Sequence, residues 1–282
     1  LGGHYFTLNS RIKSPFILTN VRNSLGIGGM TDIKYPLVEV GGTEYVNLQG
    51  DIFVALLDFE YQHAVKAWLA VWIHLGLAGR LGNSVGTLVK QGIDYATIFD
   101  IGWMIKIYRN DRFALSTSIQ VKNGNYSFIN LEQFIGDLIN NVPRASLTRS
   151  NNLVYGLAGL KAAYGINDFI GFNAMFNLGY GETVQRESDN KWFTILGINA
   201  DMNFTNVISA AVSLTLGYLH NFYSGDNDDV SILTNLFLAQ ISYIGRPDFI
   251  LSLDLSYSKE LTDAEDNDIW MTTAMLTMRY LF

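Results

Sequence analysis

The sequence predicts an all-β protein, a transmembrane antiparallel up-and-down β-barrel of twelve strands. Three observations predict it: apolar and polar residues alternate over long segments, these segments are longer than ordinary strands, and the connections alternate between short and long. Strands in soluble proteins average about 5 to 6 residues. A tilted strand needs about 9 to 11 residues to cross the hydrocarbon of a bilayer.

The composition agrees with this fold class. Hydrophobic residues make up 49% of the 282 residues and charged residues 16%, against about 25% charged residues in an average soluble domain. No apolar run reaches the roughly 18 to 20 residues of a membrane-spanning helix, so a lipid-facing surface has to be built from alternate positions. The net charge of −7 argues against a nucleic-acid partner, and the absence of cysteine excludes a disulfide scaffold.

The N-terminal segment, residues 1–44, is expected to supply the first strand. Single-chain bacterial barrels have an even number of strands, and eleven segments alternate in the rest of the chain. The best candidate for the first strand is 16–22. The same segment also fits a plug or tail inside the lumen, and both alternatives remain open. We therefore expect one β-barrel domain over 1–282, with the other strands in 45–282.

Eleven predicted strands follow in order. They span 45–61, 65–77, 99–107, 113–122, 154–164, 170–181, 192–204, 208–222, 232–244, 249–258 and 269–282. Each shows the period of two that places successive side chains on opposite faces of a sheet. In 45–61 the alternation slips between Asp51 and Asp58, which predicts a β-bulge near Gly50.

The connections predict how the barrel sits in its membrane. Short connections are expected at 62–63, 110–111, 166–168, 205–206 and 245–248, and long, largely acidic or polar ones at 80–95, 123–152, 183–191, 223–230 and 262–268. Outer-membrane barrels have short periplasmic turns and longer extracellular loops. We therefore expect a periplasmic C-terminus and extracellular long loops. Apolar residues at helical spacing predict a short amphipathic helix at 131–141.

The last strand ends in an aromatic residue that is preceded by alternating apolar residues. These residues are Ala274, Leu276, Met278, Tyr280 and Phe282. This ending resembles the C-terminal assembly signal of bacterial outer-membrane β-barrel proteins. The resemblance implies an outer membrane of a Gram-negative bacterium, with outer-membrane lipids and the barrel-insertion machinery as partners. The start Gly2–Gly3–His4–Tyr5 resembles outer-membrane channels associated with aromatic-compound degradation, and no residue role is carried over from it.

Strand parity assigns a set of charged and bulky side chains to the lumen. A charge facing lipid costs about 2 to 4 kcal/mol for Lys or Arg at the midplane, so charged residues within the strands should point inward. The candidates for lining the lumen or a constriction are Trp68, Trp72, His74, Asp100, Met104, Lys106, Lys161, Asp201, Asp254 and Arg279. They would select solutes, or they would form ion pairs and hydrogen bonds that fill the barrel.

The predicted function is an outer-membrane channel, similar to a porin, for small solutes that include apolar or aromatic ones. One alternative is a structural, secretion or adhesion barrel with a filled lumen. A less favoured one is an outer-leaflet lipid-modifying enzyme that would use His220, although its same-face neighbours Tyr218 and Phe222 fit an interfacial girdle better than a catalytic triad. We expect no enzyme, no catalytic residue, no cofactor and no metal site, because no residue cluster has the necessary spacing.

Overall fold

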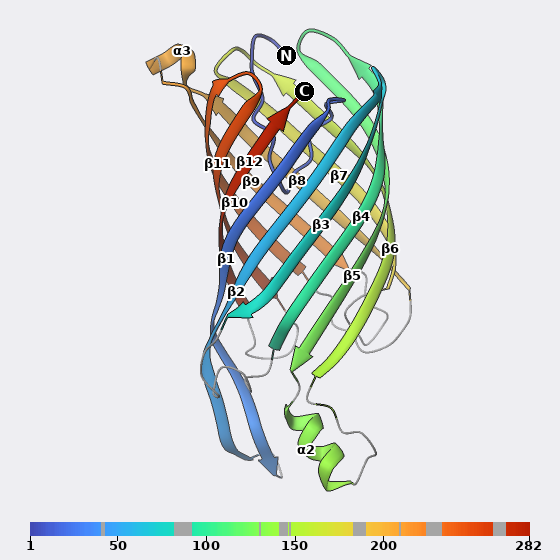
Figure 1. Ribbon diagram of the computed structural model, residues 1–282, viewed down its shortest axis with the longest axis vertical. Helices are drawn as coiled ribbons and strands as arrows, with labels where there is room; N and C mark the ends of the chain where they lie inside the picture. Colours follow the sequence, from blue (N-terminus) through green and yellow to red (C-terminus); the bar gives the residue numbers. More distant parts are fainter. Residues whose placement is uncertain are drawn as a thin grey trace.

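Twelve antiparallel strands close into a single barrel (Figure 1), which confirms the predicted fold class and strand number. This computed structural model describes residues 1–40, 43–81, 92–129, 131–140, 146, 148–182, 190–208, 210–223, 233–261 and 269–282. Each strand pairs with its neighbours in sequence, and the first pairs with the last. Closure leaves no unpaired sheet edge, which a barrel in lipid requires.

The strands are long and their connections are of two kinds. The strands are β1 (Asn20–Val40), β2 (Thr43–Lys66), β3 (Leu69–Leu81), β4 (Gly92–Arg109), β5 (Phe113–Ile129), β6 (Thr148–Gly165), β7 (Ile170–Gly181), β8 (Lys191–Asn203), β9 (Val212–Tyr223), β10 (Leu233–Arg246), β11 (Phe249–Leu261) and β12 (Ile269–Leu281). Two helices, α2 (Leu131–Ile139) and α3 (Thr205–Ile208), lie in connections. The helix predicted at 131–141 is thereby confirmed. Neither helix is long and apolar enough to cross a membrane.

Both chain ends lie at one end of the barrel, together with the short turns and α3; we call this the termini end (Figure 1). The β1–β2 ribbon and α2 extend from the opposite end. Most of the predicted long acidic connections fall outside the described residues. The register between β1 and β2 shifts where Met30 faces Ile52 and Ile33 faces Gly50. The irregularity predicted near Gly50 is therefore present, with the extra residue on β1.

Alternation separates an apolar outer face from a polar inner face. In β1, Ile27 is 61% exposed whereas Ser24 is 6% exposed. Aromatic pairs mark both ends of the outer face, as in membrane barrels. Phe249 and Tyr280 have ring centroids 5.1 Å apart near the termini end, and Tyr180 and Trp192 lie 4.9 Å apart near the other end.

Several predicted boundaries were wrong. The strand predicted from 99 begins at Gly92, and β5 and β6 extend into the connection predicted at 123–152. The first strand begins at Asn20, so it shares only its first three residues with the predicted 16–22. The first short turn lies at 67–68 and not at 62–63, because β2 continues through Lys66. The strand predicted from 208 begins at Val212, since α3 forms part of the β8–β9 connection.

Candidate functional site

Residues 1–19 form a loop inside the barrel, which enters from the termini end and returns to it (Figure 1). Backbone and side-chain hydrogen bonds attach this N-terminal loop to the wall. Asp201 on β8 accepts a hydrogen bond from the amide of Thr7, and the Thr7 hydroxyl lies 2.6 Å from that of Ser213 on β9. On the returning half, the Gln62 side chain donates to the carbonyl of Leu18 at 2.9 Å.

The tip of the N-terminal loop is a tight turn at residues 9–13. The Asn9 side-chain oxygen accepts the backbone N–H groups of Arg11 and Ile12 at 2.8 and 3.0 Å, which is the Asx-turn chemistry that favours Asn in turns. Ile12 is 1% exposed and packs in an apolar cluster with Leu219 and Leu238. The tip is therefore held by one deep apolar anchor and by its own hydrogen bonds.

Glycines on the inward face of the wall make room for this loop. A Cβ on Gly171 would collide with the ring of Phe6, and a Cβ on Gly197 would lie 3.1 Å from Cγ1 of Ile12. Larger residues at these positions would narrow the lumen. The inward glycines of these strands therefore allow the N-terminal loop to pack closely against the barrel wall.

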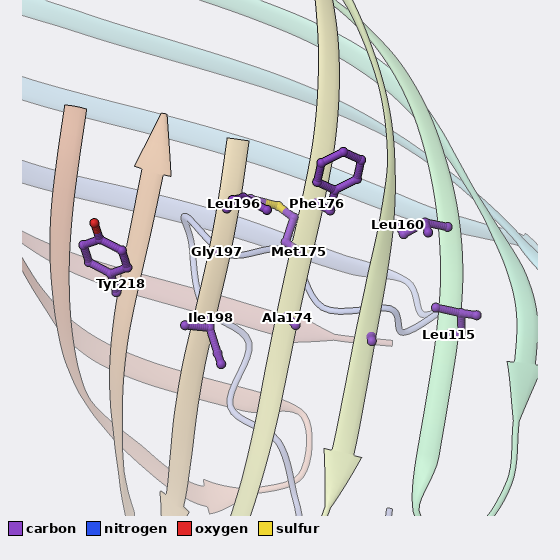
Figure 2. Close-up of a pocket in the computed structure, with 10 residues that line it drawn as sticks. Leu115, Leu160, Ala174, Met175, Phe176, Leu196, Gly197, Ile198 and Tyr218 are labelled. Atoms are coloured by element: carbon purple, nitrogen blue, oxygen red, sulfur yellow. The ribbon is translucent and has the colours of Figure 1, made fainter. Parts of the chain in front are cut away.

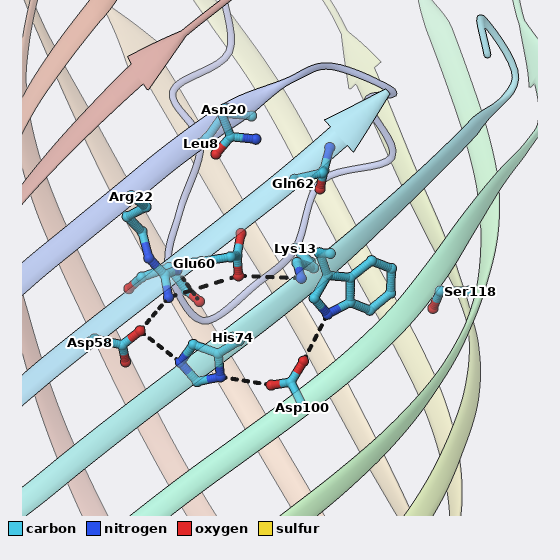
Figure 3. Close-up of polar contacts among 12 residues, drawn as sticks. Leu8, Lys13, Asn20, Arg22, Asp58, Glu60, Gln62, His74, Asp100 and Ser118 are labelled. Carbon is cyan, nitrogen blue, oxygen red and sulfur yellow. Dashed lines mark hydrogen bonds and ion pairs between the residues drawn. The ribbon is translucent and has the colours of Figure 1, made fainter. Parts of the chain in front are cut away.

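A chain of charged and polar side chains crosses β1 to β4 beside the tip (Figure 3). Arg22 Nη2 lies 2.6 Å from Asp58 Oδ1, and the same oxygen lies 2.6 Å from His74 Nε2. His74 Nδ1 lies 2.7 Å from Asp100 Oδ2, so the imidazole bridges two carboxylates. Buried charges are stable only when such partners surround them.

The tip joins this chain through the Ser10 carbonyl, which accepts a hydrogen bond from Arg22 at 3.1 Å, and through Lys13 (Figure 3). Lys13 Nζ lies 3.2 Å from Glu60 Oε2 and 3.7 Å from the centre of the Trp72 ring. The Trp72 indole N–H in turn donates to Asp100 at 2.7 Å. A Cβ on Gly102 would collide with the Trp72 ring, so the wall leaves space for the indole that supports Lys13.

A cavity of about 250 Å³ lies in the lumen beside the tip of the N-terminal loop. Side chains of the tip and of the wall line it together. Its charged lining residues are Arg11, Lys13, Arg22, Asp58, Glu60, His74, Asp100, Lys122 and Lys161. Its apolar lining residues are Leu157, Met175, Ile195, Leu219, Leu236 and Met275.

Nine of the ten predicted lumen residues fall into three groups. His74, Asp100 and Lys161 line the cavity. Trp72, Met104, Asp201 and Arg279 are buried inside the barrel; Asp201 binds Thr7, and Arg279 donates to Asn20 at 2.8 Å. Asp254 on β11 accepts a hydrogen bond from Thr277, and Lys106 lies on the inward face of β4 near the termini end without lining the cavity.

The assignment of Trp68 to the lumen was wrong. Trp68 lies in the β2–β3 turn and is 52% exposed. The alternation in 65–77 continues through this turn, and apolar residues on both sides of it concealed where the strand ends. At a barrel rim, an exposed tryptophan fits the aromatic belt of a membrane interface.

Arg11, Lys13 and Arg22 were not among the predicted site residues. Arg11 and Lys13 lie in a segment without a strand period that would assign a face, and Arg22 was the last residue of the predicted first strand, whose faces were not assigned. One signal pointed to them. The parity of the second strand places Asp58 and Glu60 inward, and buried carboxylates need cations. Lys13 and Arg22 supply those cations.

A second hollow, of about 430 Å³, lies in the outer surface over β5 to β9 (Figure 2). Its lining is apolar and includes Leu160, Phe176 and Ile198. This hollow opens on the face that is apolar throughout. It therefore belongs to the lipid-facing surface rather than to the polar lumen.

The closed barrel, its apolar outer face, its two aromatic rims and its polar interior together define the fold of bacterial outer-membrane β-barrel proteins. Neither a protein-family model nor a curated protein matches the sequence.

Solved structures with this fold are similar over nearly the whole chain. An outer membrane channel from Pseudomonas putida F1 is 10% identical with a TM-score of 0.57, covering 98% of this chain and 100% of its own. The deltaS2 mutant of the TodX monoaromatic hydrocarbon channel is 12% identical with a TM-score of 0.50, covering 96% and 93%. The translocator domain of the autotransporter NalP from Neisseria meningitidis is 9% identical with a TM-score of 0.53, covering 94% and 88%. At these identities the likeness shows the fold.

Proposed function

We propose that this protein is an outer-membrane channel for small solutes, and that residues 1–19 close its lumen and rearrange to open it. The observation that carries the proposal is the charged cavity beside the tip of the N-terminal loop. A barrel that serves only as an anchor has no need of a polar space lined by Arg11, His74 and Lys161. Structures described as channels share the fold, including one for monoaromatic hydrocarbons.

The N-terminal loop is attached by contacts that water can replace. Thr7, Asn9 and Leu8 use hydrogen bonds to Ser213, Gln240 and Arg279. Each such bond contributes about 0.5 to 1.5 kcal/mol net, because the separated groups bond to water instead. Ile12 is the deepest apolar anchor. The loop can therefore move by exchanging these hydrogen bonds for bonds to water, and the barrel does not have to unfold.

The proposed location is the outer membrane of a Gram-negative bacterium, with the termini end in the periplasm and the longer connections outside. The separation of short turns from α2 and the β1–β2 ribbon supports this orientation. Phe282 at the end of β12 would be read by the barrel-insertion machinery, and the outward apolar face would contact lipid. Residues 1–282 would act as one domain.

A reversible cross-link tests whether the N-terminal loop has to move. The chain has no cysteine, so the variant Thr7→Cys/Ser213→Cys carries a single possible disulfide, at a site where the two native hydroxyls are 2.6 Å apart. The disulfide should abolish conductance in planar bilayers and uptake of sugars by liposomes. Reduction should restore both to the wild-type level.

The matched control is Ser242→Cys/Ser252→Cys, whose hydroxyls lie 2.8 Å apart on β10 and β11. This disulfide joins two wall strands and leaves the N-terminal loop free, so oxidation should not change conductance. Equal conductance of the oxidised Thr7 variant and the wild type would show that solutes pass without movement of the loop. A wild-type protein that is silent in both assays would refute the channel itself.

The second candidate is a structural or translocator barrel with a filled lumen. The buried position of His4, Phe6 and Thr7 in the lumen favours it, and the NalP translocator domain shares the fold. A variant that lacks residues 1–12 separates the two functions. The channel predicts a large gain of conductance on deletion together with measurable wild-type conductance, whereas the filled barrel predicts a silent wild type.

An outer-leaflet lipid enzyme finds less support. His220 Nδ1 lies 2.9 Å from the Asn235 side-chain oxygen, and its ring stacks beside Tyr218. Among the described residues, no serine hydroxyl forms a hydrogen bond with His220. The geometry is that of a rim histidine held by polar and aromatic neighbours.

A further inference from the structure

The cavity contains more cations than its own carboxylates neutralise. Asp58 and Glu60 pair with Arg22 and Lys13, and Asp100 bonds to His74 and Trp72. Each of the three carboxylates that line the cavity is therefore already engaged. The remaining lining cations are Arg11, Lys122 and Lys161, and none of them forms an ion pair within the part of the chain that the structure describes.

Lys161 is the least explained of these cations. It lies on the inward face of β6 and is 2% exposed, and within the described residues its ammonium group has the Ser118 hydroxyl as its hydrogen-bond partner. A buried ammonium group without an opposite charge is costly. Because Lys161 lines the cavity, a bound anion would supply the missing partner.

The same cavity has an apolar side. Leu157, Met175 and Leu219 line it together with Ile195, Leu236 and Met275. A ligand that fills the cavity therefore contacts cations on one side and alkyl groups on the other. The three engaged carboxylates disfavour a dianion, since each would repel a second negative charge. The volume of the cavity, about 250 Å³, lies below the roughly 300 to 1,000 Å³ of pockets for drug-sized ligands, so the ligand should be small.

We propose that this cavity binds a small monocarboxylate with an apolar body. Lys161 would pair with the carboxylate, and the apolar lining residues, which include Leu157 and Leu219, would contact the apolar body. This inference deepens the proposed function, since it names the class of solute that the channel would select. Arg11 belongs to the tip of the N-terminal loop, so the ligand would contact the loop and the wall together.

Binding is tested by isothermal titration of the detergent-solubilised full chain with benzoate. Benzoate should bind, whereas benzyl alcohol, which lacks the charge, and acetate, which lacks the apolar body, should bind at least about tenfold more weakly, as expected from losing one charge-assisted bond or one buried apolar group. Inorganic phosphate should not compete. Equal affinity for benzoate and benzyl alcohol, or competition by phosphate, would overturn the proposal.

The decisive variant is Lys161→Met, which keeps the side-chain length and removes the charge. It should weaken benzoate binding at least about tenfold and leave the thermal stability of the barrel unchanged or higher, because an unpaired buried charge is removed. The control Lys106→Met changes a lysine on the same inward face outside the cavity and should leave binding unchanged. Loss of stability without loss of binding would show that Lys161 is structural.

The two proposals fail separately. Binding of benzoate by a protein that is silent in bilayers would leave the site intact and refute the channel. Conductance of the wild type without selective binding of benzoate would leave the channel intact and refute the site.

Discussion

A Cβ on Gly217 would lie 3.2 Å from Cδ1 of Ile12. The tip of the N-terminal loop therefore packs against β9 at a glycine, where the strand has no side chain. The same side chain packs in the cluster of Met175, Leu219 and Leu238. This contact joins a segment without regular structure to the barrel wall. In the proposed channel, its strength would set how often the loop leaves the lumen.

Truncation of the anchor should release the N-terminal loop. Thr7→Cys introduces the only cysteine at a position that is 1% exposed, so its labelling by a water-soluble maleimide reports opening. Adding Ile12→Ala should raise the labelling rate at least about tenfold, since truncation of a buried Ile costs about 2 to 5 kcal/mol. The control Ile198→Ala truncates an outward side chain that is 53% exposed and should leave the rate unchanged. An unchanged rate in the Ile12 variant would contradict the role of anchor.

Filling the space beside Ile12 should also release the N-terminal loop, because it displaces the Ile12 side chain. Gly217→Leu places a side chain where Ile12 lies, so the tip can no longer dock and the Thr7→Cys labelling rate should rise. Combining Gly217→Leu with Ile12→Ala should lower the rate again, because the smaller residue at the tip makes room for the larger one on the wall. Additive increases in the double variant would refute direct contact.

Two arginine–aspartate pairs in different surroundings should contribute unequally to stability. Arg22 is 3% exposed and bonds to Asp58. Arg246 at the end of β10 bonds to Asp248 in the β10–β11 turn, and both of these side chains are more than half exposed. Arg22→Met should destabilise the barrel by about 3 to 5 kcal/mol, since Asp58 and the buried Glu60 both lose the guanidinium group that contacts them. Arg246→Met should cost about 0 to 1 kcal/mol. The unfolding temperature, read from the gel mobility of the folded barrel, distinguishes them; equal shifts would contradict the network.

The orientation in the membrane can be read from single cysteines in intact cells. Gly136→Cys on α2 has open space around it and should react with a membrane-impermeant maleimide. Asp248→Cys in the β10–β11 turn lies at the termini end and should react only after the outer membrane is permeabilised. The opposite pattern would place the termini end outside the cell.

Much of the wall was predictable from sequence, because a strand period of two assigns each side chain to a face without knowledge of its neighbours. Asp201 and Lys161 were placed inward in this way, and both are buried. The even strand number then required a strand within 1–44. Trp68 departs from this rule, since alternation alone does not reveal where a strand ends and a turn begins.

The sequence by itself determined the barrel, its strand number and the two faces of its wall, because these follow from local alternation and from closure. Only the tertiary structure decided that residues 1–19 lie inside, that Lys13 reaches Glu60 and Trp72, and that Lys161 faces a cavity. Those contacts join residues far apart in the chain. They depend on strand register around the barrel and on a segment without a period, and no local pattern encodes either of them.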